Sequence, residues 1–203
     1  NVSSYWYGVQ FDYCNFVMNA NKFHQRSTSI SNPRFVYSYY AGVYNSSGRS
    51  LMSNNEIIGF SSDYSEAMNL YYCALDIYHN SILMQGNGSI TNIYIGGSST
   101  YVTDCKNNNF VNLSSDGYLL YVDNAGIYTG DYNNLYSFNS IGYYNGLQSS
   151  LNDWQTVSGQ DIHSVTVSPI YLGDSSKSLK LFDYTGLACP ALLNVTEDIE
   201  GVL

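Results

Sequence analysis

A large side chain, an asparagine and a large apolar residue recur at fixed spacing along the first two-thirds of the chain. The large side chain lies three residues before the asparagine, and the apolar residue lies two after it. The five copies are Met18–Asn21–Phe23, Met52–Asn55–Ile57, Ile77–Asn80–Ile82, Cys105–Asn108–Phe110 and Tyr136–Asn139–Ile141. Successive asparagines are 34, 25, 28 and 31 residues apart. A period of about 20 to 50 residues is typical of a solenoid.

Each repeat contains two strand-like runs, and the second run leads into the asparagine. The first runs are residues 9–13, 35–39, 69–72, 92–95 and 118–122. Side chains alternate along a strand, so positions three before and two after the asparagine share one face only if the chain turns between them. Asparagine tolerates left-handed backbone angles, and its amide can bond a neighbouring coil. We therefore expect a turn at each asparagine, with all five aligned at one corner of a stack of parallel coils.

Composition supports an all-β fold. Charged residues are 11% of the chain, whereas 22 tyrosines and 17 glycines favour pleated surfaces and turns over helices. The pattern predicts a parallel β-helix solenoid of about five coils over residues 1–146.

The pattern changes from Leu147 onward, and residues 147–203 form the predicted closing segment of the same domain. Apolar residues at Leu147, Leu151, Trp154 and Val157 indicate a short amphipathic helix. Ser150 or Asn152 would cap it. Short strands are expected at 165–167 and 170–172, interrupted by Pro169.

Charge and hydropathy exclude two classes of partner. The net charge of −9, with seven basic residues, disfavours nucleic acid, because phosphate neutralisation requires clustered Lys and Arg. No stretch approaches the roughly 18 apolar residues of a membrane-spanning helix. The chain begins at Asn1 without an initiator methionine, so we expect a monomeric module of a larger chain.

Residues 153–172 resemble the closing signature of right-handed parallel β-helix surface proteins of Bacteroidetes-type bacteria. That family carries W-Q-x-x-x-G-x-D-x-x-S followed by a P-h-(F/Y)-h step. The matching residues are Trp154, Gln155, Gly159, Asp161, Ser164, Pro169 and Tyr171. Residues 195–201 resemble the D-I-(D/E)-G stretch that follows. The resemblance implies a right-handed, pectate-lyase-like β-helix that is secreted or at the cell surface, a fold that hosts lyases, hydrolases, esterases and adhesins.

Two aspartates are the candidate metal ligands. Asp76 and Asp104 each lie four residues before their asparagine, so they are expected to be neighbours on successive coils. Two adjacent carboxylates can bind calcium or share a proton. The alternative is a pair of exposed strand acids. Calcium is the only cofactor that the pattern suggests, and Lys106 is the nearest candidate for a catalytic base.

Paired tyrosines are the candidate carbohydrate contacts, since aromatic rings can stack on sugars while their hydroxyls form hydrogen bonds. The candidates are Tyr39, Tyr40, Tyr71, Tyr72, Tyr143 and Tyr144. The alternative is that they are simply good strand formers.

These features predict a non-catalytic module that mediates adhesion or binds extracellular polysaccharide or host glycan. The first alternative is a carbohydrate-active enzyme, either a polysaccharide lyase or a glycoside hydrolase, with its active site on the β-helix face. The second is a structural spacer. The resemblance to surface proteins places the module outside the cell.

Overall fold

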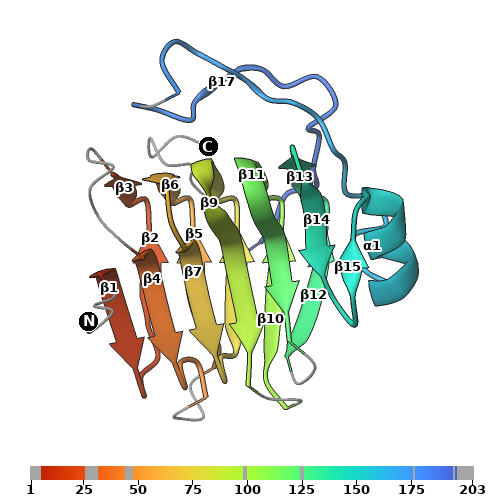
Figure 1. Cartoon of the computed structure of the whole chain (residues 1–203). Helices are drawn as coiled ribbons and strands as arrows, with labels where there is room; N and C mark the ends of the chain where they lie inside the picture. The colour runs from red at the N-terminus through yellow and green to blue at the C-terminus, as the bar shows by residue number, and fades with distance from the viewer. Residues whose placement is uncertain are drawn as a thin grey trace.

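The computed structural model of the chain describes residues 6–25, 32–43, 48–97, 100–123, 126–175, 177–193 and 195. It is all-β, with 56% strand, and its stacked parallel coils form a β-solenoid of about 4 turns (Figure 1). The predicted fold class is therefore confirmed, with about four turns rather than about five. The 195–201 stretch of the resemblance, apart from Val195, lies outside the described residues.

Two sheets line the solenoid. The larger one contains β1 (Trp6–Asp12), β3 (Lys22–His24), β4 (Pro33–Tyr39), β6 (Glu56–Ser61), β7 (Ser65–Tyr71), β9 (Ser81–Gly96), β11 (Asn109–Val122), β13 (Asn134–Ser137), β14 (Ser140–Tyr143) and β15 (Leu147–Gln148). The second sheet contains β2 (Val17–Asn19), β5 (Ser50–Ser53), β8 (Leu75–Tyr78), β10 (Val102–Lys106) and β12 (Ile127–Asp131). Within each sheet the paired strands are parallel, except that β15 folds back antiparallel on β14. The long strands β9 and β11 each run along two sides of the coil, so β9 pairs first with β6 and then with β7.

A row of buried asparagine amides joins the turns at one corner. The backbone N–H and Nδ2 of Asn55 both donate to Oδ1 of Asn80, at 3.0 and 2.9 Å. Nδ2 of Asn55 also donates to the carbonyl of Met18 in the preceding turn, at 2.9 Å. The same pattern repeats along the row, whose members are Asn21, Asn55, Asn80, Asn108 and Asn133. The predicted corner is thus confirmed for the first four asparagines.

Asn139 was the wrong choice for the fifth position. It is exposed, and its Nδ2 donates to the carbonyl of Gly117, away from the row. The true fifth member, Asn133, has Leu135 buried two residues later, but glycine stands three residues before it. A side chain on this glycine, Gly130, would strike the ring of Tyr128, which fills the space instead. A pattern that requires a large residue at that position therefore does not include this repeat.

The left-handed turn also lies one residue earlier than predicted. The residues with positive φ at this corner are those immediately before each asparagine: Ala20, Asn54, His79, Asn107 and Tyr132, with φ of 56°, 55°, 55°, 58° and 56°. The asparagine that follows points its side-chain amide into the stack. There it forms hydrogen bonds with backbone N–H and C=O groups that the turn leaves without a backbone partner.

Inward side chains on both sides of this corner form the core. Met52, Ile77 and Cys105 precede their asparagines by three residues and are fully buried. Ile57, Ile82 and Phe110 follow them by two and are also fully buried. Strand register places each set in line across the turns, so apolar residues that no single coil could bury form one continuous core.

Helix α1 (Leu151–Ser158) closes the end of the stack after β15 (Figure 1). Ser150 caps it, because its Oγ accepts from the backbone of Asp153 while the Asp153 carboxylate accepts from Ser150 N–H. Trp154 is its buried residue, whereas Leu147 and Val157 are 59% and 44% exposed. The predicted helix is therefore confirmed, but it begins later than expected.

Five of the seven matched signature residues, Trp154, Gln155, Gly159, Asp161 and Ser164, lie in the cap of the stack, and Pro169 and Tyr171 lie in the segment that follows it. The fully buried carboxylate of Asp161 accepts from Trp154 Nε1 and Tyr128 OH, both at 2.8 Å. It also accepts from Nδ2 of Asn133 at 2.9 Å and from Oγ of Ser164 at 2.6 Å. Since Ser164 Oγ accepts from the N–H of Asn133 at 2.8 Å, Asp161 and Ser164 terminate the asparagine row.

Residues 166–175 and 177–193, here called the C-terminal strap, lie across the solenoid and carry the antiparallel pair β16 (Ile170–Tyr171) and β17 (Leu181–Asp183) (Figure 1). Leu179 packs on Ile58, Leu83 and Val111, and its N–H donates to the buried Glu56 carboxylate at 2.7 Å. Instead of the strand predicted at 165–167, Val165 makes an isolated bridge to Asn134. The strap thus covers apolar side chains on the outside of the larger sheet.

Candidate functional site

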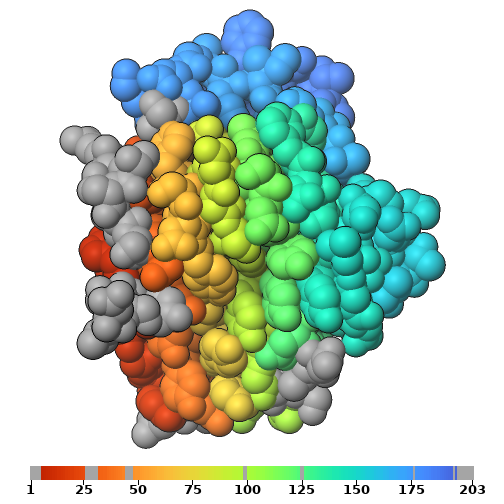
Figure 2. All heavy atoms as spheres, viewed as in Figure 1, coloured from red at the N-terminus to blue at the C-terminus, as the bar shows by residue number. Residues whose placement is uncertain are grey.

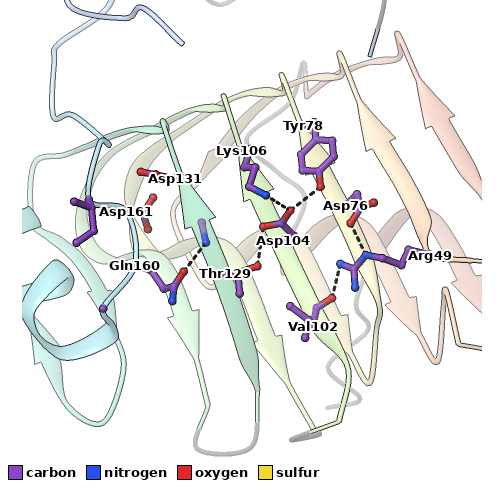
Figure 3. Close-up of a pocket in the computed structure, with 13 residues that line it drawn as sticks. Arg49, Asp76, Tyr78, Val102, Asp104, Lys106, Thr129, Asp131, Gln160 and Asp161 are labelled. Carbon is purple, nitrogen blue, oxygen red and sulfur yellow. Dashed lines mark hydrogen bonds and ion pairs between the residues drawn. The ribbon is translucent and has the colours of Figure 1, made fainter. Parts of the chain in front are cut away.

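A polar groove of about 650 Å³ lies on the outer face of the second sheet, bordered by residues 159–162 of the cap (Figure 3). Its floor consists of two rows of outward side chains. Asp76, Asp104 and Thr129 occupy equivalent positions on β8, β10 and β12. Two residues further along the same strands lie Tyr78, Lys106 and Asp131. The prediction that Asp76 and Asp104 are neighbours on successive coils is therefore confirmed.

Each of the two aspartates is paired with a cation. Asp76 accepts from Nε of Arg49, whose guanidinium also donates to the carbonyl of Val102 (Figure 3). The same guanidinium donates to the carbonyl of Leu75. Asp104 accepts from Lys106 Nζ at 2.8 Å, from Tyr78 OH at 2.6 Å and from Thr129 Oγ1 at 2.7 Å. Because Arg49 already pairs with Asp76 and three donors already bind Asp104, the groove is a preorganised hydrogen-bonding surface.

Two acids of the groove stay ionised at neutral pH. Burial acts to raise the pKa of Asp104, but hydrogen bonds from Lys106, Tyr78 and Thr129 outweigh it and lower that pKa. At Asp131 burial also acts upward, and hydrogen bonds from the His163 ring and backbone lower the pKa. A general acid requires the opposite, a carboxyl whose pKa is raised towards neutrality.

Calcium binding at Asp76 and Asp104 remains a prediction. Calcium takes about six to eight oxygen ligands, several of them carboxylates. Across the described ranges, no three His, Cys, Asp or Glu side chains lie close enough together to hold a metal ion. If calcium binds here, backbone, hydroxyl or water oxygens must therefore complete its shell.

A second candidate surface lies on the outer face of β1, β4, β7, β9, β11 and β14 and is here called the tyrosine face. Its members are Tyr13, Tyr37, Tyr39, Tyr40, Tyr71, Tyr72, Tyr94, Tyr118, Tyr121 and Tyr143. Most are half-buried, and Tyr13 is 52% exposed. Figure 2 shows the molecule from this side, with the successive turns as parallel bands of side chains.

Many of these rings stack on one another along the solenoid axis. Tyr40 lies between Tyr13 and Tyr72, with ring centroids 5.3 and 4.6 Å apart and planes within 9°. Tyr121 lies between Tyr94 and Tyr143 in the same way, at 5.2 and 4.9 Å. Stacking covers both faces of Tyr40 and of Tyr121 and one face of each outer ring, so the two central rings present only edges and hydroxyl groups.

Two rings are turned across the stacks. Tyr39 lies at 83°, 89° and 88° to Tyr13, Tyr40 and Tyr72. Tyr118 lies at 62° and 66° to Tyr121 and Tyr143. Their faces are therefore not covered by a coplanar neighbour.

The structure brings together five of the six predicted sugar-contact residues, Tyr39, Tyr40, Tyr71, Tyr72 and Tyr143. Tyr144 lies elsewhere: it packs against the core, with its ring 6.1 Å from that of Trp154. Side chains alternate along β14, so the residue after the outward Tyr143 turns towards the cap.

Sequence reasoning missed several groove residues for an identifiable reason. Thr129 lies four residues before Asn133, as Asp76 and Asp104 do before their own asparagines. Recognition of Asn133 as a corner residue would have predicted Thr129 and Asp131 in the groove. Arg49 lies two residues before the outward Leu51, so alternation along that strand was the available signal.

Comparisons of the chain with protein-family models, curated proteins and solved structures found no match. The family suggested by the closing signature therefore has no support beyond the residues that carry the resemblance. No helix among the described residues has the length and apolar character needed to traverse a lipid bilayer.

Proposed function

We propose that the protein is a non-catalytic, extracellular module that binds a polysaccharide along its tyrosine face. The single observation behind the proposal is the continuity of this face, on which half-buried tyrosines follow one another across β1, β4, β7, β9, β11 and β14. A repeating surface suits a repeating ligand, because the tyrosines of successive turns can contact successive units of a polymer.

Within this face, different rings have different roles. The stacked rings offer hydroxyl groups, and burial together with neighbouring tyrosines raises the pKa of Tyr40 and of Tyr121, so both remain protonated donors at neutral pH. Tyr39 and Tyr118 offer ring faces on which an apolar sugar face can stack. Sugar stacking therefore centres on these two residues.

The charge of the chain favours a neutral polysaccharide. With a net charge of −9, the protein repels polymers of uronic or sulfated sugars at long range. The resemblance to bacterial surface proteins supports the extracellular location, which would bring the module into contact with such polymers.

Affinity electrophoresis tests the proposal, in gels that contain either neutral glucans, mannans or xylans, or the anionic polymers pectate and alginate. The wild-type chain should be retarded by a neutral polymer. Tyr39→Ala combined with Tyr118→Ala should weaken binding about thirtyfold, since each of the two aromatic contacts contributes on the order of 1 kcal/mol. The matched control is Tyr184→Ala, which removes a 64% exposed tyrosine on the strap and should leave binding unchanged.

The runner-up is a carbohydrate-active enzyme with its active site in the polar groove. The favouring observation is that Asp76 and Asp104 lie side by side, with Asp131 and Lys106 nearby. The lowered pKa values of Asp104 and Asp131 suit a nucleophile or base but leave no acid among these two groups.

Incubation with the same polymers decides between the two. Release of reducing ends, or of unsaturated uronate absorbing in the near ultraviolet, that disappears in Asp104→Asn would establish the enzyme. Binding that survives Asp104→Asn without product supports the module. If the chain neither binds these polymers nor releases product from them, the structural spacer becomes the supported function.

A further inference from the structure

The two ends of the solenoid differ in how their backbone and side-chain groups are satisfied. At the α1 end, Asp161 and Ser164 accept from Asn133, and Trp154 covers the last turn. At the other end lie β1, β2 and β3, each of which pairs on one side only among the described strands. Figure 1 shows β1 at one end of the stack and α1 at the other.

The inward side chains of this open end are incompletely covered. Val9, Phe11, Phe16 and Phe23 pack against the core but are only half-buried. Their counterparts one turn later are fully buried: Val36 and Ser38 lie opposite Val9 and Phe11, and Ile57 lies opposite Phe23. The core therefore continues to the open end, where no apolar side chain among the described residues covers it.

Within the part of the chain that the structure describes, the asparagine row ends here on an acceptor that receives no hydrogen bond. Oδ1 of each later asparagine accepts the N–H and Nδ2 of the asparagine in the turn before it. No described residue donates to Oδ1 of Asn21. Its Nδ2 also lacks the carbonyl that a preceding turn supplies to Asn55, Asn80, Asn108 and Asn133, and donates instead to the carbonyl of Asn19 in its own turn, at 3.0 Å.

We propose that this open end, formed by β1, β2, β3 and Asn21, is a docking surface for a further parallel β-solenoid coil that carries an asparagine at its corner. Such a coil supplies the two donors for Asn21 Oδ1 and a carbonyl for its Nδ2. It also supplies parallel strands for the three strand edges that no described strand pairs with, and an apolar cover for Val9 and Phe11. The partner is defined by the contacts that already join one turn to the next.

A second copy of this chain does not fit that description. Two copies meeting at their open ends would run in opposite directions and set Asn21 Oδ1 against Asn21 Oδ1, acceptor against acceptor. A copy arriving by its other end would present α1 and the Asp161 cap, where the asparagine donors are already used. The geometry therefore favours a coil whose strands run parallel to those of this chain, and whose corner asparagine can still donate its backbone N–H and Nδ2 to Asn21.

The test adds such a coil to the chain. Trp6 pairs with Pro33, and Ser65 pairs with Ile90, so these four residues occupy equivalent positions in the register. A copy of residues 65–89 joined directly to Trp6, in place of residues 1–5, carries duplicates of β7, β8, Asn80 and the first part of β9. Asn80 in the copy would then lie above Asn21.

Hydrogen exchange measured by mass spectrometry is the readout. In the extended chain the amides of β1, β2 and β3 should exchange about tenfold more slowly than in the original chain, with a higher Tm. The matched control is the same extension with Asn80→Ala in the copy, which should lose part of the gain. Unchanged exchange in β1 to β3 would overturn the proposal. So would a dimer of the original chain, seen by light scattering, in which the same amides are protected.

Discussion

The chain makes left-handed turns at two corners of the solenoid, and different side chains stabilise the turns at each corner. At the asparagine corner, left-handed residues such as His79 precede an amide that points into the stack. At the tyrosine corner, Tyr13, Tyr40 and Tyr72 are themselves left-handed, with φ of 52°, 52° and 55°, and their rings stack on the outside. Both corners also carry backbone hydrogen bonds between turns.

The difference separates stability from recognition. The buried amides have each other and backbone carbonyls as partners, so a change there leaves polar groups unsatisfied in the interior. The stacked rings are half-buried, and water can replace the contacts that they lose. The asparagine corner should therefore determine whether the chain folds, and the tyrosine corner should determine what the folded surface contacts.

The largest expected effect is at the centre of the asparagine row. Asn80→Ala removes the acceptor for Asn55 N–H and Nδ2 and the donor to the carbonyl of Met52. We expect a loss of about 4 kcal/mol or more in the free energy of unfolding, measured by urea denaturation. Asn139→Ala, at an exposed asparagine outside the row, should cost less than about 0.5 kcal/mol. Equal losses would mean that the row does not hold the turns together.

The apolar residue two positions later tests the packing that the same corner aligns. Ile82 is fully buried, so Ile82→Ala should cost about 2–5 kcal/mol through lost burial and the cavity left behind. Val17 faces outward and is 73% exposed, and Val17→Ala should be nearly neutral in the same urea titration. A loss below about 1 kcal/mol for Ile82→Ala would contradict its place in the core.

At the tyrosine corner the expected effects are smaller. Tyr72→Ala removes the stack on Tyr40 and should cost about 1 kcal/mol. Tyr72→Gly removes the same ring but relieves the left-handed strain, so it should be more stable than Tyr72→Ala by up to about 1 kcal/mol. The fourth turn already has Gly97 at this corner, with φ of 94°. Thermal melts of the two variants give the comparison, and a less stable glycine variant would refute the strain argument.

The smallest effects concern pH, to which the two corners should respond in opposite directions. Burial lowers the pKa of His79. The contribution of its neutral ring to the free energy of unfolding is therefore present above the unfolded pKa of about 6.5, and it is lost as pH falls through the folded pKa. Burial and the neighbouring tyrosines raise the pKa of Tyr40. The contribution of its neutral phenol to the free energy of unfolding is therefore present below about pH 10, and it is lost as pH rises through the folded pKa.

Tm measured against pH separates these contributions. His79→Gln should flatten the acid side of the profile, and Tyr40→Phe should flatten the alkaline side. A variant that changes the opposite side would show that its residue does not titrate in the way its surroundings imply.

The sequence predicted the corner itself because asparagine amides and their apolar neighbours recur in one chemical pattern. It failed at Asn133 because Gly130 gives up its inward position to the ring of Tyr128, a substitution visible only in three dimensions. The pair of Asp76 and Asp104 followed from spacing alone, whereas the cations beside them come from the preceding turn or from two residues along the strand. The stacking that hides most tyrosine faces depends on ring orientation, which spacing does not specify.

The aligned amides at the asparagine corner also act together as a dipole. Each of the five donates its backbone N–H and one Nδ2 hydrogen towards α1, and Oδ1 of the last four accepts from the β1 side, so partial positive charge accumulates at one end of the row and partial negative charge at the other. The buried carboxylate of Asp161 lies at the positive end, much as an acidic residue lies at the start of an α-helix. A net dipole thus runs along the solenoid axis through the apolar interior, with its positive end at α1 and its negative end at β1.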